Sequence, residues 1–159
     1  MEPCVPYGWQ FSDEKVGMPS SKGEGRNCFA LITRDNRCVW KMVNHSVTAE
    51  FIVEQLESLS FQIVRPTVVV LDNAKIHHGQ WVKSRLSVWQ ERGLFIFYLP
   101  TYSPHLNIAE VLWRKLKYEW LSAEDYLYAG TLFHVVWQAL AAVGNSLRIN
   151  FSQFNHGLV

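Results

Sequence analysis

Two acidic residues, Asp72 and Glu110, stand where a carboxylate could do chemistry. Asp72 directly follows Thr67–Leu71, a continuous β-branched and apolar run that is typical of a strand buried on both faces. Catalytic groups and ligands collect at the carboxyl ends of such strands in open α/β sheets. A carboxylate at this position can hold Mg²⁺, which prefers oxygen ligands. The alternative is that Asp72 only caps a turn.

Glu110 lies three residues after Asn107, near the start of a predicted helix. This spacing resembles a capping box, in which the acid has a purely structural role. A carboxylate in the first helical turn is also kept ionised by the helix dipole and can bind a metal. On the same helix, Arg114 and Lys117 fall on the face of Glu110, whereas apolar residues at other positions turn toward the core. A carboxylate backed by two cations suits a site that faces phosphate, and a solvated basic face is the alternative.

Polar and aromatic residues in two loops add candidates for contact with phosphate or nucleic acid. Lys75, His77 and His78 follow Asp72 closely, and phosphate contact fits them better than zinc, which needs further ligands at suitable spacing. Tyr102 lies in the turn-rich loop at residues 99–104. That loop either steers the chain into its helix or places the ring against nucleic acid.

Length, composition and charge favour one folded domain over residues 1–159. The chain has 48% apolar residues and a net charge of +1, which excludes a disordered protein. We expect no membrane span, no signal peptide and no disulfide framework, because no apolar run is long enough and the three cysteines are scattered. Residues 72–118 hold seven basic and three acidic residues, as a local anion-binding face would require.

Apolar periodicity predicts the elements that must position these residues. Residues 28–33 and 38–43 read as a hairpin, and residues 67–71 and 94–99 as buried strands. Helices are expected from residue 48, from about 79 to 92, over 108–121 and over 132–143. A strand, a helix and a strand at this spacing indicate a parallel βαβ unit. The predicted class is therefore α/β, an antiparallel hairpin joined to parallel strands, after a loop-like stretch over residues 1–26.

Two sequence blocks together carry a resemblance to a known family. The first is Val68-Val-Val-Leu-Asp72-Asn-Ala-Lys75-Ile-His77. The second is Leu99-Pro-Thr-Tyr102-Ser-Pro-His-Leu-Asn107-Ile-Ala-Glu110-Val-Leu-Trp113. They resemble the DDE transposases, and more narrowly the bacterial insertion-sequence relatives of the mariner group, whose pattern is Asp-Asn-Ala with a nearby His, then Leu-Pro-x-Tyr-Ser-Pro-x-Leu-Asn-Pro-Ile-Glu-x-Leu-Trp. Residues 5–9 and 19–23 also resemble segments of that family.

The resemblance implies an RNase H-like mixed sheet flanked by helices. It makes Asp72 the second catalytic aspartate and Glu110 the final acid, both as ligands of Mg²⁺ (or Mn²⁺). Two such ions would activate water or a DNA 3′-OH and stabilise an in-line phosphoryl transfer. The implied substrate is double-stranded DNA, namely transposon ends and target, rather than a small molecule. Basic residues would contact its backbone, and the protein would be associated with the bacterial nucleoid in the cytoplasm.

The chain departs from the family pattern at two places. Ile108-Ala109 replaces Pro-Ile before the acid, which weakens a helix start without removing a ligand. The family's first aspartate lies upstream of the segment that residues 5–9 resemble, and Asp13 and Glu14 lie on the other side of it. We therefore expect an amino-terminally truncated catalytic core without the first central strand or a helix-turn-helix region, inactive on its own. Because the missing strand would expose sheet edges and apolar surface, we also expect a homodimer or strand exchange. The alternatives are a non-catalytic module that binds DNA or a partner, and an RNase H-like host nuclease.

Overall fold

The computed structural model describes residues 27–151, and these fall into two compact units. One unit spans residues 46–107, and the other contains the described residues before and after it. The resemblance at residues 5–9 and 19–23, Asp13, Glu14 and the predicted loop over residues 1–26 lie outside the described residues. The prediction of a single domain stays a prediction.

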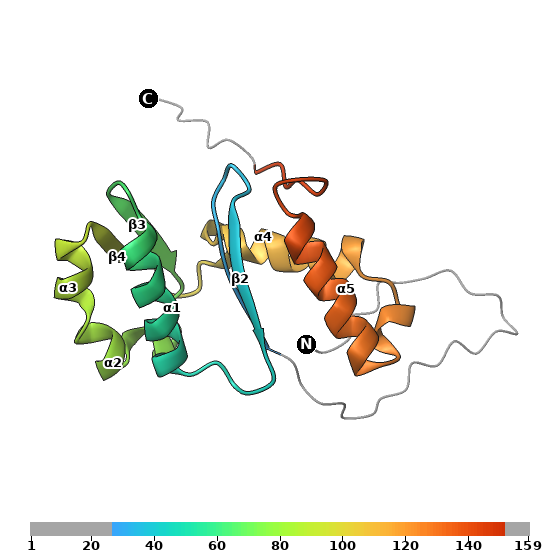
Figure 1. Cartoon of the computed structure of the whole chain (residues 1–159), viewed down its shortest axis with the longest axis horizontal. Helices are drawn as coiled ribbons and strands as arrows, with labels where there is room; N and C mark the ends of the chain where they lie inside the picture. The colour runs from blue at the N-terminus through green and yellow to red at the C-terminus, as the bar shows by residue number, and fades with distance from the viewer. Residues whose placement is uncertain (1–26, 152–159) are drawn as a thin grey trace, which may run out of the picture. The chain divides into compact units, whose positions relative to one another are not determined.

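The unit of residues 46–107 contains the predicted βαβ arrangement (Figure 1). Its helices and strands are α1 (Ala49–Gln62), β3 (Thr67–Leu71), η1 (Lys75–His78), α2 (Gln80–Lys83), α3 (Leu86–Glu91), β4 (Leu94–Tyr98) and η2 (Pro104–Leu106). Strands β3 and β4 pair in parallel, with Val69 opposite Ile96 and Leu71 opposite Tyr98. This confirms the parallel pair, and it places the end of β3, where Asp72 follows, beside the end of β4. The predicted burial of both faces is not observed within the described residues, because Val68, Val70, Phe95 and Phe97 on one face are 41–61% exposed.

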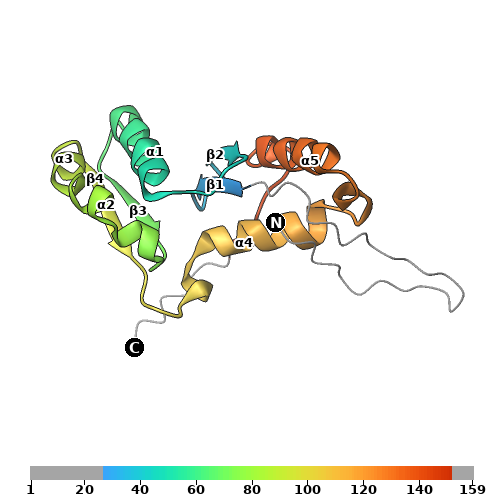
Figure 2. The same ribbon diagram turned by 90° about the horizontal axis from the view of Figure 1, so that it is seen from below.

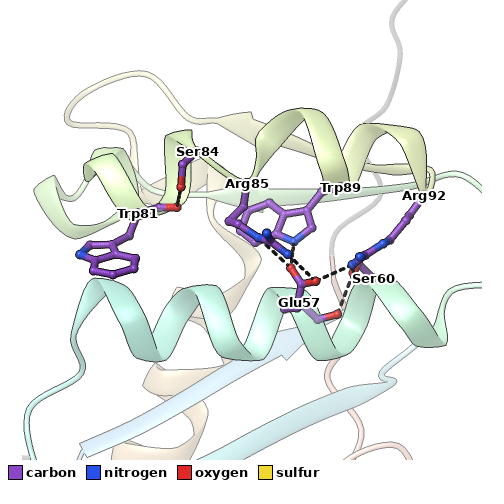
Figure 3. A network of polar contacts seen from close by, with 7 residues as sticks. All are labelled: Glu57, Ser60, Trp81, Ser84, Arg85, Trp89 and Arg92. Carbon is purple, nitrogen blue, oxygen red and sulfur yellow. Dashed lines mark hydrogen bonds and ion pairs between the residues drawn. The ribbon is translucent and has the colours of Figure 1, made fainter.

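Helix α1 is attached to the following helices by one carboxylate. Thr48 begins the helix as predicted, because its side chain accepts a hydrogen bond from the Phe51 N–H. Farther along, Glu57 accepts hydrogen bonds from Arg85, Trp89 and Arg92 at 2.6–3.2 Å (Figure 3). The network therefore joins α1 to α3 and to the residues on either side of α3.

The predicted continuous helix over residues 79–92 is wrong, because α2 and α3 are separate. The Ser84 hydroxyl donates to the Trp81 carbonyl at 2.8 Å, and the Arg85 N–H donates to the Val82 carbonyl three residues back. A serine hydroxyl that bonds a nearby carbonyl competes with the helical ladder. The break leaves Arg85 where its guanidinium reaches Glu57.

The second unit packs a hairpin with two helices (Figure 2). Its helices and strands are β1 (Asn27–Ile32), β2 (Cys38–Val43), α4 (Ile108–Lys115), η3 (Leu116–Trp120), η4 (Glu124–Tyr126) and α5 (Ala129–Ala142). The hairpin is antiparallel as predicted. Helix α4 contacts β1, and α5 contacts β2. Buried side chains of both helices and of the segment after α5 form its core.

The predicted helix over residues 108–121 begins and ends where expected but changes type. It is α-helical to Lys115, and η3 is a π-helix over Leu116–Trp120. Leu112 and Leu116 are fully buried, which confirms the predicted apolar face. Because a π turn contains more residues than an α turn, side chains after Leu116 are rotated relative to a continuous α-helix.

Asn36 and Gly144 connect the hairpin turn to the chain after α5. Asn36 is buried in a left-handed conformation (φ 65°) and exchanges two hydrogen bonds with Ile149, at 2.7 and 3.1 Å. Gly144 also has a positive φ of 87°, and its α-carbon faces the Asn36 carbonyl so closely that a β-carbon would lie 2.5 Å from that oxygen. The hairpin turn and the carboxyl-terminal segment thus fit together only with glycine at position 144.

The described residues form two separate two-stranded sheets, β1–β2 and β3–β4. The mixed α/β class is confirmed, but the single RNase H-like mixed sheet is not observed in this part of the chain. None of the helices within residues 27–151 is long and apolar enough to cross a membrane.

The two described cysteines are free thiols on the hairpin. Burial raises the pKa of Cys28 to about 12, with a smaller contribution from Cys38, and burial raises the pKa of Cys38 to about 11. Both thiols are therefore protonated at neutral pH and poorly reactive.

Candidate functional site

Asp72 is positioned at the carboxyl end of β3 by its own turn. Its Oδ1 accepts a hydrogen bond from the Ala74 N–H at 3.1 Å, and it lies 2.8 Å from His77 Nδ1. The side chain of Asp72 is nevertheless 51% exposed. The predicted turn cap and the predicted ligand position are therefore compatible, because one oxygen forms the turn while the carboxylate still reaches solvent.

His77 is held in place behind this carboxylate. Its ring is only 13% exposed, and its Nδ1 also lies 3.1 Å from the Asp72 carbonyl oxygen. Its backbone carbonyl accepts a hydrogen bond from the Tyr98 hydroxyl at 2.9 Å. Because Tyr98 ends β4, the pairing of the two strands determines where the histidine stands.

Tyr98 also orients the second histidine of η1. The His78 ring stacks on the Tyr98 ring with centroids 4.2 Å apart. Burial raises the pKa of Tyr98, so its hydroxyl remains a donor to His77 at neutral pH. His78 Nε2 is buried and has no hydrogen-bond partner among the residues that the structure describes. This histidine therefore contributes a ring face to the packing of η1.

Glu110 lies in the first turn of α4 with an exposed side chain. Asn107, which directly precedes α4, has an extended backbone (φ −87°, ψ 105°), as expected just before a helix start. Its position at the amino-terminal end of α4 leaves the Glu110 carboxylate open to solvent and to a ligand.

The remaining predicted contact residues are distributed over both units. Lys75 is exposed in η1, and Tyr102 is 99% exposed in a left-handed conformation (φ 58°). Arg114 is exposed on α4, and Lys117 is half-buried in η3. An exposed cation can contact phosphate, and an exposed ring can stack on a base.

The structure brings Asp72 and His77 together. Asp72 and Glu110 belong to different units, so their convergence on one metal stays a prediction. Within residues 27–151, no group of three or more His, Cys, Asp or Glu side chains is gathered as a complete metal site. The two carboxylates do fit Mg²⁺ or Mn²⁺ as oxygen donors, because both are exposed and Asp72 is already oriented.

Sequence reasoning did not identify two features of this site. It assigned His77 to phosphate contact, whereas the observed geometry favours a role in orienting Asp72. It also treated Tyr98 only as part of an apolar strand. The position of Tyr98 follows from the observed parallel register, which places the last residue of β4 opposite the last residue of β3.

Comparison with known families adds independent evidence. The sequence model of the family described as DDE superfamily endonuclease matches residues 1–131, which is most of the chain. No curated protein matches the chain.

Proposed function

Because the chain belongs to the DDE superfamily endonucleases, we propose that it is a transposase catalytic core in which Asp72 and Glu110 are two of the carboxylates that bind Mg²⁺ or Mn²⁺. The bacterial relatives of the mariner group are the subgroup that its motifs resemble. Double-stranded DNA is the proposed substrate, and the bacterial nucleoid the proposed location. The observation that carries the proposal is the exposed Asp72 carboxylate at the end of a parallel strand, oriented by His77.

Each residue has a distinct role in this proposal. Asp72 and Glu110 hold the metal, which when bound polarises a phosphate oxygen or activates the attacking hydroxyl. His77 holds the Asp72 carboxylate in one orientation, as outer partners of metal ligands commonly do. Lys75, Arg114 and Lys117 neutralise phosphates, His78 packs behind the loop, and Tyr102 offers a stacking surface.

Binding of Mn²⁺ to the 159-residue chain, measured by titration calorimetry, tests the carboxylates. We expect Asp72→Asn and Glu110→Gln each to weaken binding more than about tenfold, and His77→Ala to weaken it about tenfold through loss of orientation. Glu91→Gln removes an exposed carboxylate from the end of α3 and serves as the matched control. Equal affinities in all four variants would contradict the proposed site.

Binding and cleavage of duplex DNA distinguish the proposed catalytic core from a module that only binds DNA. With two of the family's three carboxylates assigned, we expect salt-dependent DNA binding but no strand cleavage by this chain with Mn²⁺. Cleavage would overturn the expectation of inactivity. A module that only binds DNA would retain its affinity in Asp72→Ala and would also lack site-specific Mn²⁺ binding.

We also propose that the chain forms a homodimer. One face of the β3–β4 sheet presents four exposed apolar side chains, Val68, Val70, Phe95 and Phe97. Exposed apolar patches of this kind commonly mark association surfaces. Light scattering should give twice the chain mass, and replacing Val70 and Phe97 by threonine should reduce it. A monomer at high protein concentration would contradict the dimer.

A further inference from the structure

An open groove lies between the amino-terminal half of α1 and the indole of Trp81 on α2. Its volume is about 330 Å³, and its lining residues are Glu50, Val53, Glu54, Glu57, Trp81 and Arg85. Figure 3 shows the Trp81 ring over the first turns of α1, on the side away from the Glu57 network. Trp81 is 59% exposed, which is unusual for so large an apolar side chain.

The groove carries an uncompensated negative charge. Helix α1 contains three glutamates and no lysine or arginine. Glu57 is neutralised by Arg85 and Arg92. Arg85, the basic residue that lines the groove, is therefore already paired with Glu57. Glu50 and Glu54 have no ion-pair partner among the described residues, so two carboxylates remain on the open side.

This combination selects one kind of occupant. Lysine and arginine have apolar stems that pack on apolar surface while their charged ends reach polar groups. An indole face adds cation–π attraction to such a group. DNA is repelled by the same carboxylates. We propose that the groove binds an arginine- or lysine-bearing segment of a partner protein, independently of the DNA-binding residues.

The proposal requires that Trp81 and the two carboxylates act together on a cationic peptide. The affinity of the chain for fluorescein-labelled hexaarginine tests this. The 159-residue chain is titrated into the peptide at about 0.15 M salt, and the fluorescence anisotropy of the peptide is followed. We expect Trp81→Ala and the double variant Glu50→Gln/Glu54→Gln each to weaken binding at least about fivefold. Trp81→Phe retains an aromatic face and should retain most of the affinity, so a folding defect in Trp81→Ala would not obscure the result.

The control is Glu91→Gln, which removes one carboxylate from α3, outside the groove, and is compared with each single groove variant, Glu50→Gln and Glu54→Gln. If Glu91→Gln binds hexaarginine as weakly as the groove variants do, the net charge of the chain alone attracts the peptide, and the proposal fails. Equal binding of labelled hexaglutamate would also overturn it. Loss of duplex DNA binding in Trp81→Ala would show that the groove contacts nucleic acid, and it would overturn the proposal of a protein partner.

Discussion

Replacing Gly144 by alanine is expected to destabilise the unit that carries Glu110 by about 3 kcal/mol. The new β-carbon would lie 2.5 Å from the Asn36 carbonyl oxygen, at a backbone φ of 87°. Either the left-handed backbone must change or the hairpin turn must move. Both responses disturb the two buried hydrogen bonds between Asn36 and Ile149. Urea unfolding followed by tryptophan fluorescence measures the loss of stability.

Gly130→Ala is the matched control for this prediction. Gly130 lies near the start of α5. Apart from its chain neighbours and the adjacent backbone of α5, no described atom lies within 4 Å of the position that its β-carbon would take. Alanine is a better helix former, so this variant should be neutral or more stable by up to about 1 kcal/mol. If both variants unfold at the same urea concentration, the close approach of Gly144 to Asn36 does not stabilise the fold.

Local elements were predictable from the sequence because each follows from a short pattern. The β-branched run at Thr67–Leu71 and the turn residues between β1 and β2 indicate their structure without reference to the rest of the chain. The break between α2 and α3 was not predictable in this way. It depends on the Ser84 hydroxyl and on a carboxylate 28 residues earlier that attracts Arg85.

The candidate site was predictable in its residue types but only partly in its geometry. The motif around Asp72 predicts the carboxylate, and Asp72 lies within residues 1–131, which the family model matches. The role of His77 depends on a hydrogen bond from Tyr98, on the neighbouring strand. A contact of this kind requires the strand register, which residue patterns alone do not specify.

Glu57→Gln is expected to destabilise the unit that carries Asp72 by about 2 kcal/mol at neutral pH. The bond from Arg85 is the main cause that lowers the pKa of Glu57 to about 2, and bonds from Arg92 and Trp89 add to it against the opposing effect of burial. Lowering the pKa of Glu57 from 4.5 to about 2 corresponds to about 3 kcal/mol of folding free energy. Because Glu57 and both arginines are partly exposed, solvent screening reduces this contribution. Glutamine also leaves two guanidinium groups without their carboxylate.

The pH dependence distinguishes this network from simple packing. Because the pKa of Glu57 is lower in the folded chain, its contribution is fully present above about pH 4.5 and is lost as the pH falls toward 2. The stability gap between the wild-type chain and Glu57→Gln should therefore close over that interval in urea unfolding. Glu54→Gln, one turn earlier on α1, should show little gap at any pH. A gap that stays constant down to pH 2 would mean that the Glu57 side chain acts through its shape and not through its charge.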